Sequence, residues 1–184
     1  MRSSILVLLL SFFLVACGTT SGIKHGGNES SQLNLSSYSM VTIGDFSDST
    51  KKQDLPVSAS RDFGDLIARE IIKKAVFDEV TKEPVDTQAI TIGGEITRYA
   101  KGNAALKALV GFGAGSTYFD AKVTFHDSIS GEFLGEVVVD KNSWGAGGWL
   151  AASQTIESFM TGAAKKIANE LAKAKAIQEV EATN

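Results

Sequence analysis

The sequence predicts one α+β (or open α/β) domain, in which two helices pack on one face of a mainly antiparallel sheet in the order β-α-β-β-β-α. Several segments alternate apolar and polar residues, as half-buried strands do. Two other segments, one early and one near the C-terminus, repeat apolar residues every three or four positions, as amphipathic helices do. The chain has 184 residues and 43% apolar content, which suits one domain with its own core.

The early part of the domain predicts a strand, a helix and a short strand. Residues 40–46 are mostly apolar and predict a buried strand. A helix then begins at Ser58 or Ser60, because serine caps helix N-termini, and it fades near Ala75. Residues 76–81 predict a short strand. This β-α-β order favours some parallel pairing in the sheet. The apolar stripe of the helix is Phe63, Leu66, Ile67 and Ile71.

Residues 90–99 predict a half-buried strand, because isoleucines alternate with polar residues there. The pair Gly93-Gly94 within it predicts a bulge or the close passage of another element. Residues 103–110 predict one or two helical turns.

Residues 118–127 and 133–141 predict a hairpin around a turn at residues 128–131, where Gly131 suits a positive φ. Residues whose numbers sum to about 259 then lie opposite each other. A final helix is expected from about Leu150 to Lys175, with the pairs Lys165-Lys166 and Lys173/Lys175 on a solvated face. Its apolar stripe is Ile156, Phe159, Met160, Ala163, Ile167 and Leu171.

The N-terminus carries a basic Arg2, an apolar run of 11 residues from Ile5 to Val15, and Cys17, the one cysteine of the chain. This arrangement resembles a bacterial lipoprotein signal, which implies cleavage before Cys17 and lipidation of that residue. An uncleaved anchor is disfavoured, since 11 residues rise about 16 Å against a hydrocarbon core of about 30 Å. An ordinary secretory signal would leave an odd free thiol.

The expected organisation follows from this signal. Residues 1–16 form the signal peptide, 17–37 the lipidated cysteine and a flexible tether, 38–176 the periplasmic domain, and 177–184 a polar tail. Gly18 follows the cysteine where an aspartate would favour inner-membrane retention, so the resemblance implies the periplasmic face of the outer membrane. The mild acidity, −3 for the full chain, argues against nucleic acid as a partner.

Two glycine-rich segments with aromatic residues stand out: residues 109–116 and 143–149. The hairpin register places position 115 opposite position 144, so both clusters should meet at the open end of the hairpin. The two readings are tight packing at sheet corners and an apolar contact surface for a protein partner or a bilayer, with Phe112, Trp144 and Trp149 as the contact residues. The glycines concerned are Gly111, Gly113, Gly115, Gly145, Gly147 and Gly148.

These glycines do not predict a nucleotide site. A dinucleotide site needs glycines that open a helix, whereas Gly115 leads into a strand. A phosphate-binding loop would need a lysine where Ser116 stands.

No motif for catalysis or metal binding is present, and we expect no enzyme activity, cofactor or metal. Asp45 is expected to form a turn or cap after the first strand, and Glu95 to pair with Arg98. His126 is expected to be an exposed surface residue. An enzyme would need Asp45, Glu95 and His126 to converge.

Several short runs together resemble a family of Gram-negative lipoproteins known only as a domain of unknown function. They are residues 94–99 (GEITRY), Gly102-Asn103, residues 109–116 (LVGFGAGS), and the hairpin with Asp127 and Gly131. The likeness spans about residues 40–175. It implies a periplasmic lipoprotein without an established activity. Lys107 stands where the family pattern has arginine, so no bidentate role is expected of it.

The sequence therefore favours a lipid-anchored, non-enzymatic interaction or structural module of the cell envelope, with a protein partner in the envelope and an undefined oligomeric state. The alternatives are a small-molecule or lipid-binding periplasmic domain, supported by a cavity between the last helix and the sheet, and a subunit of a secretion or transport assembly.

Overall fold

A computed structural model describes residues 35–51, 55–110, 114–142 and 152–176. Five strands form one mixed sheet in the order β2-β1-β3-β4-β5. The strands are β1 (Met40–Asp48), β2 (Glu79–Thr81), β3 (Ile90–Ala100), β4 (Tyr118–Asp127) and β5 (Phe133–Asn142). The helices are α2 (Ala59–Ile72), α3 (Ala104–Leu109) and α5 (Ile156–Ala176). The α+β prediction is confirmed.

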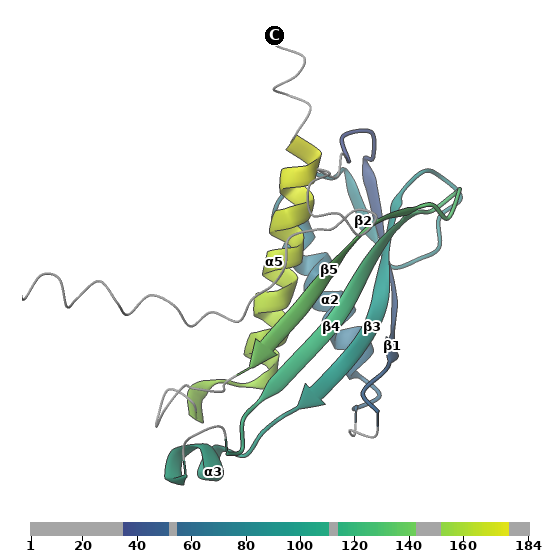
Figure 1. Ribbon diagram of the computed structural model, residues 1–184. Helices are drawn as coiled ribbons and strands as arrows, with labels where there is room; N and C mark the ends of the chain where they lie inside the picture. Colours follow the sequence, from purple (N-terminus) through teal and green to yellow (C-terminus); the bar gives the residue numbers. More distant parts are fainter. Residues whose placement is uncertain (1–34, 52–54, 111–113, 143–151, 177–184) are drawn as a thin grey trace, which may run out of the picture.

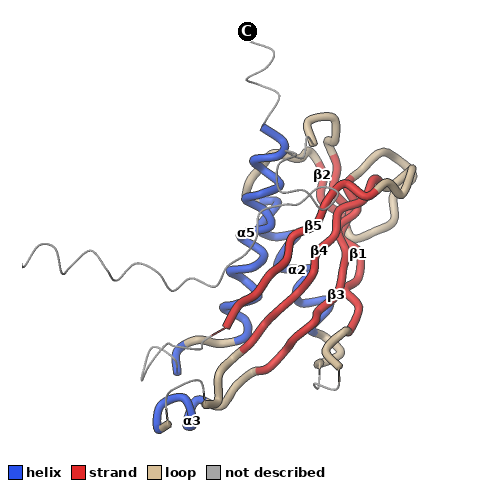
Figure 2. Tube along the Cα trace, in the orientation of Figure 1, coloured by secondary structure: helices blue, strands red, loops and turns tan. Residues whose placement is uncertain are grey.

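Two layers make up the fold: α2 and α5 lie side by side on one face of the sheet, and α3 projects beyond the end of β3 (Figures 1 and 2). Strand β1 pairs in parallel with β2 and β3, as the β-α-β order predicted. The long β3-β4-β5 ladders are antiparallel. The sheet is thus mainly antiparallel.

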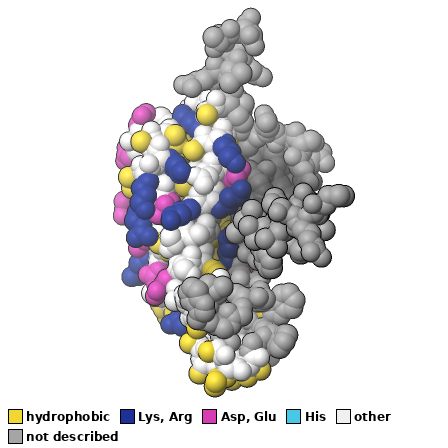
Figure 3. Space-filling model, turned by 90° about the vertical axis from the view of Figure 1, so that its left-hand side faces the viewer, with side chains coloured by type: hydrophobic (Ala, Val, Ile, Leu, Met, Phe, Trp, Pro, Cys, Tyr) yellow, Lys and Arg dark blue, Asp and Glu magenta, His cyan; other side chains and the backbone are white. Residues whose placement is uncertain are grey.

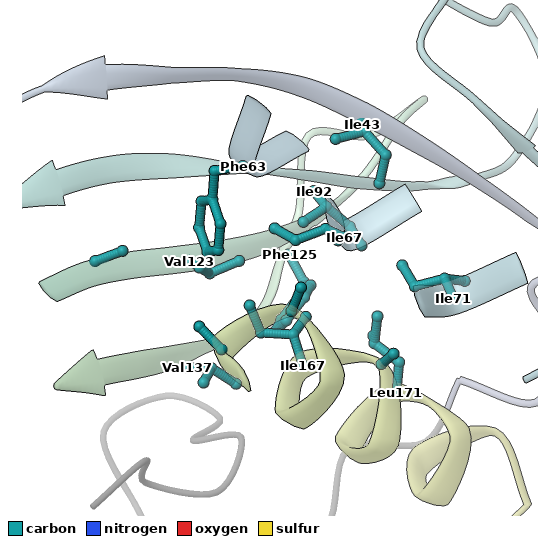
Figure 4. Close-up of a cluster of buried hydrophobic side chains, with 14 of the residues drawn as sticks. Ile43, Phe63, Ile67, Ile71, Ile92, Val123, Phe125, Val137, Ile167 and Leu171 are labelled. Carbon is teal, nitrogen blue, oxygen red and sulfur yellow. The ribbon is translucent and has the colours of Figure 1, made fainter. Parts of the chain in front are cut away.

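The core fills the space between the helices and the sheet (Figure 4). The isoleucines of β3 and alternate residues of β4 and β5 point toward α2 and α5, because strand side chains alternate between faces. Phe63 of α2 packs edge-on to Phe119 of β4, with ring centroids 4.8 Å apart. Most of the predicted stripes are buried, whereas Leu66 and Phe159 are partly exposed.

Gly94 lets β3 and β4 approach closely. Its φ is +142°, and a Cβ built there would lie 2.0 Å from the carbonyl oxygen of Lys122. The expected close passage of another element is therefore confirmed. One bulge lies across the ladder in β1, where Ile43 pairs with Ile92 and Phe46 with Gly94. Another lies in β3 itself, between Ile96 and Arg98.

Several predicted details were wrong. Asp45 lies inside β1, which runs on to Asp48, and forms neither a turn nor a cap. Ser58 precedes α2 without a side-chain capping bond, and Ser60 Oγ instead accepts a hydrogen bond from the backbone N–H of Phe46 (2.9 Å). That bond ties the start of α2 to the outgoing β1 strand.

Helix α5 begins at Ile156, later than the expected Leu150. The hydroxyls of Thr155 and Ser158 each accept a hydrogen bond from the other residue's backbone N–H, both at 3.2 Å. This reciprocal capping fixes the helix start.

The folded body includes residues that the sequence assigned to the tether. Leu35 is fully buried, and its N–H donates to the carbonyl oxygen of Ala174 at 3.1 Å. Lys175 does not lie on a solvated face, because its ammonium group donates to the carbonyl oxygens of Ser36 (2.8 Å) and Tyr38. The predicted signal peptide, most of the tether and the tail (177–184) lie outside the described residues.

Candidate functional site

The folded body has two distinct ends. One end holds the β4-β5 turn, the C-terminus of α5 and Leu35 (Figure 1). The other end holds α3 and the start of α5. The N-terminal start of the described chain and helix α3 therefore lie at opposite ends of the sheet.

The end around α3 exposes a cluster of apolar side chains, which we call the apolar pole. Its members are Leu106, Leu109 and Val110, with 46%, 84% and 56% of their surfaces exposed. Yellow atoms gather among white ones at the same end of the molecule in the space-filling view (Figure 3). Exposed apolar side chains that cluster together often mark an interaction surface, whereas single exposed ones are common on any protein.

Asn103 shapes the start of α3. It is extended, with φ −129° and ψ 113°, and its side-chain oxygen accepts a hydrogen bond from the backbone N–H of Leu106 at 3.1 Å. This is N-cap geometry, which satisfies an otherwise unpaired amide at the helix start. At the other end, the N–H of Val110 donates to the carbonyl oxygen of Leu106 at 3.0 Å.

Gly115 fastens α3 to the incoming β4 strand. Its carbonyl oxygen accepts a hydrogen bond from the N–H of Asn103 at 2.8 Å. Its φ is +63°, and a Cβ would lie 2.6 Å from the Asn103 carbonyl oxygen and 2.8 Å from Leu106 Cβ. Only glycine fits this position, so at Gly115 tight corner packing is the correct reading.

Thr117 joins the pole to the helical layer. This buried residue donates from its hydroxyl to the carbonyl oxygen of Lys101 (2.9 Å), and the hydroxyl also lies 3.3 Å from the carbonyl oxygen of Gln154. A surface hollow of about 290 Å³ lies beside it. Its lining residues are Lys101, Gly102, Ala104, Ala152, Gln154, Thr155, Ile156 and Glu157.

A pair of carboxylates lies on the open face of the sheet near this end. Asp120 and Asp140 are direct cross-strand neighbours. Burial, followed by the like charge of Asp140, raises the pKa of Asp120 to about 6.

Next to this carboxylate pair, the guanidinium carbon of Arg98 lies 3.5 Å from the centre of the Tyr118 ring. Arg98 thus stacks on Tyr118, while Glu95 accepts a hydrogen bond from Ser49 at 2.6 Å. The expected Glu95–Arg98 pair is not formed.

Most of the sequence-predicted site residues lie outside the described residues. They are Cys17, Gly111, Phe112, Gly113, Trp144, Gly145, Gly147, Gly148 and Trp149. Their roles as lipidation site and contact residues stay predictions. Leu109, within the first glycine segment, is exposed. The exposure of Leu106 and Val110 was missed, although a short helix whose apolar residues fall on more than one side is a signal for it.

The predicted hairpin register is close to the observed one. Most pairs sum to 260, one more than expected, because an irregularity lies between Phe125 and His126 near the turn. Tyr118 lies opposite Asn142, so the described flanks of the two glycine segments do meet at the open end of the hairpin.

The residues considered for catalysis do not converge. Thr91 pairs with His126 and Glu95 with Lys122 in the β3-β4 register. Four residues of strand, about 13 Å, therefore separate Glu95 from His126 along the sheet. His126 is half-buried, with Nδ1 3.3 Å from the Gly131 carbonyl oxygen and its ring against Phe133. Within residues 35–176 as described, no three histidine, cysteine or acidic side chains gather around a common metal position.

None of the described helices combines the length and the apolar character needed to cross a bilayer.

Comparison with known proteins identifies one family. Residues 27–147 match the model of a domain of unknown function, DUF4410. This confirms the predicted resemblance to an uncharacterised domain family. Comparison with curated proteins gives no match.

Solved structures share the fold at low sequence identity. A dodecamer of a PelC point variant from Paraburkholderia phytofirmans matches with a TM-score of 0.58 and 14% identity, over 88% of this chain and 100% of that one. A second PelC dodecamer from the same organism gives 0.56 and 14%, over 84% and 97%. Protein XCC0632 from Xanthomonas campestris gives 0.50 and 10%, over 79% and 90%. At these identities the likeness concerns the fold alone.

Proposed function

Since the chain belongs to the DUF4410 family, a domain of unknown function, we propose from its own features that it is a lipid-anchored envelope protein that acts as a non-enzymatic interaction module. Cys17 is the anchor, on the periplasmic face of the outer membrane. The apolar pole, together with Phe112, Trp144 and Trp149, is the contact surface. The observation that carries the proposal is the exposure of three apolar side chains on a tip that is firmly held.

The way the pole is held supports a binding role. Leu109, the most exposed of the three, sits on a helix capped by Asn103 and pinned by Gly115 and Thr117. A tip prepared in this way loses little conformational entropy when it binds, so its buried apolar area converts more fully into affinity. An exposed apolar tip without a partner would instead be a liability for solubility.

The described surface supports binding more than catalysis. Asp45, Glu95 and His126 do not share a site. The raised pKa of Asp120 has an explanation within the sheet, namely burial beside the like-charged Asp140. Such pairs also occur outside active sites.

Self-assembly is a second candidate function. It is favoured by the fold, which this chain shares with a protein that forms a dodecamer in its crystals. An apolar pole on one copy could then contact the next copy in a ring or another closed assembly.

A small-molecule or lipid-binding domain is less favoured. That alternative called for a cavity between the last helix and the sheet. Fully buried side chains instead fill the space between α5 and the sheet, among them Ile167 and Leu171 of α5 and Phe125 of β4 (Figure 4). A hollow of about 400 Å³ lies between α2 and α5, but acidic side chains (Asp62, Asp65 and Glu157) line part of it.

Substitution at the pole tests the contact surface. We expect the double variant Leu109→Ser/Val110→Ser to lose crosslinked partners in intact cells while its circular dichroism spectrum stays unchanged. Ile129→Ser is the matched control, because Ile129 is 61% exposed on the β4-β5 turn at the opposite end. Crosslinks that survive in the double variant, or that vanish equally in the control, would refute the proposed contact surface.

The crosslinked species also separate the two candidate functions. Products at multiples of the chain mass indicate self-assembly, and products of other masses indicate a different partner. Labelling with radioactive palmitate tests the anchor separately, since Cys17→Ala should abolish the label.

A further inference from the structure

Basic side chains gather on the outer surface of α2 and α5, toward the end that also holds Leu35. We call this surface the basic face. Its six cationic residues are Arg69, Lys73, Lys74, Lys165, Lys166 and Lys173. The same part of the two helices holds two carboxylates, Glu70 and Glu170, so its formal charge is +4, in a chain whose total is −3. Dark blue atoms spread over this face in Figure 3.

Both carboxylates are engaged by the cations around them. Glu70 is only 4% exposed and accepts a hydrogen bond from Lys73 at 2.6 Å, with Arg69 Nε at 3.8 Å. Glu170 bridges Lys166 (2.8 Å) and Lys173 (3.1 Å). The anions lie inward and the cations outward, since the side chains of Arg69, Lys73 and Lys173 are 57%, 55% and 70% exposed. The field that this face presents outward is therefore positive.

An apolar side chain stands within the same patch. Ile72, between Arg69 and Lys73, is 59% exposed. Basic residues around an exposed aliphatic side chain are the composition of interfacial surfaces that sit at the level of lipid headgroups. The exposed carboxylates Asp62, Asp65 and Glu157 lie toward the other end of the helices. Two more acidic residues lie outside the helices: Asp78 just before the edge strand β2, and Glu79 at its first position.

The described part of the chain begins at the same end of the body as this face. Leu35 is bonded to Ala174 at the C-terminal end of α5. Seventeen residues, 18–34, separate it from Cys17. If that segment is the flexible tether that the sequence predicts, its average reach is about 23 Å. An anchor at Cys17 would thus hold the basic face within reach of the bilayer surface.

We propose that the basic face docks on an anionic phospholipid surface and lays α2 and α5 against the membrane that holds the anchor. This inference rests on the proposed lipid anchor. Each basic side chain at an anionic surface contributes about 1 kcal/mol, or about fivefold in partitioning. The attraction falls as salt shortens the screening length.

The experiment uses the mature chain, residues 17–184, with Cys17→Ser so that no acyl chain contributes to binding. Its sedimentation is measured with vesicles of phosphatidylcholine and about 30 mol % phosphatidylglycerol, and with phosphatidylcholine alone. We expect binding to the anionic vesicles only, and a loss of that binding when salt rises from about 0.05 to 0.5 M.

A matched pair of variants tests the location. Lys74→Gln/Lys165→Gln should lower partitioning about 25-fold, because two face cations are lost. Lys51→Gln/Lys101→Gln removes the same charge from exposed lysines that lie outside the basic face, and should change partitioning less than about twofold. Circular dichroism checks that each variant is folded.

Three outcomes overturn the proposal: no binding to the anionic vesicles, equal binding to both vesicle types, or equal losses in the two double variants. The failure of the anchor is read independently, from palmitate labelling of the chain with Cys17 intact. If the chain with Cys17 is labelled but the Cys17→Ser form does not bind anionic vesicles, the proposed anchor is supported and the docking of the basic face is refuted. The first outcome directs attention to an anionic protein or polysaccharide as the occupant of the face.

Discussion

The mounting of the apolar pole depends on Gly115, and substitution with alanine measures that dependence. A residue with a Cβ at φ +63° costs about 1 to 2 kcal/mol from backbone strain alone. The added Cβ would also lie 2.6 Å from the Asn103 carbonyl oxygen, so Asn103 must move. Moving it loosens the N-cap and the bond to the Gly115 carbonyl oxygen, each worth about 1 kcal/mol. We therefore expect a total loss of about 2 to 4 kcal/mol.

Gly131 supplies the control for backbone strain. Its φ is +70°, yet a Cβ there would meet no atom within 4 Å. Gly131→Ala should therefore cost only the strain of about 1 to 2 kcal/mol. Urea unfolding gives the free energy of each variant, and amide exchange at Asn103 and Leu106 reports on α3 itself. The reasoning fails if Gly115→Ala loses no more stability than Gly131→Ala and leaves both amides equally protected.

Three further predictions concern stability. Burial, and after it the charge of Asp140, raises the pKa of Asp120 from 3.8 to about 6 in the folded state, so the stability that Asp120 contributes is complete below pH 3.8 and is lost as pH rises through 6. Asp140→Asn removes only the second of these two causes, and urea unfolding should show it gaining up to about 1 kcal/mol over the wild-type chain at pH 8 but not at pH 4. Hydrogen bonds from the Ser130 N–H and then the Tyr38 hydroxyl hold the pKa of Asp127 well below its usual range, so the stability that Asp127 contributes is present above its unfolded-state pKa and is lost as pH falls. In an acid titration followed by fluorescence, Asp127→Asn should therefore lose stability less steeply than the wild-type chain between about pH 5 and 3. Thr117→Val should cost about 1 to 2 kcal/mol in urea unfolding, because the Lys101 carbonyl oxygen loses its donor, and an unchanged midpoint would show that the hydroxyl does not hold the pole.

The parts of the fold that the sequence predicted are those in which local pattern and burial agree. Ile90, Ile92 and Ile96 alternate, and all three are fully buried. The β4-β5 turn fell at residues 128–131, because Gly131 accommodates the positive φ that such turns need. Gly94 was also interpretable, since glycine inside a strand marks a close backbone approach.

The errors arose where a tertiary contact decides what a residue does. Ser60 is a residue type that caps helices, but its hydroxyl instead accepts a hydrogen bond from the N–H of Phe46. Leu35 and Lys175 lie near opposite ends of the described part of the chain, and each is fixed by a contact whose partner is about 140 positions away. No local pattern contains those partners.

The basic face was missed for the same reason. Lys165 and Lys166 were assigned to a solvated helix face, and the total charge of −3 was taken as an argument against nucleic acid as a partner. Only the packing of α2 beside α5 places Lys73 and Lys74 on the same surface as those lysines. Net charge therefore concealed a segregation of charge that the fold creates.

The two proposed surfaces constrain one another through the shape of the body. Strand β3 has 11 residues, about 36 Å of extended chain, and the apolar pole lies beyond its end. If the basic face lies on lipid, the long axis of the body runs along the membrane, and the pole points sideways at the height of the bilayer surface. Contacts made there join neighbours in the plane of the membrane. Without the basic face on lipid, the pole is free to stand off the bilayer by the length of the body and tether together. Charge substitutions on α2 and α5 should therefore alter which partners the pole crosslinks, although they lie at the opposite end of the helices from α3.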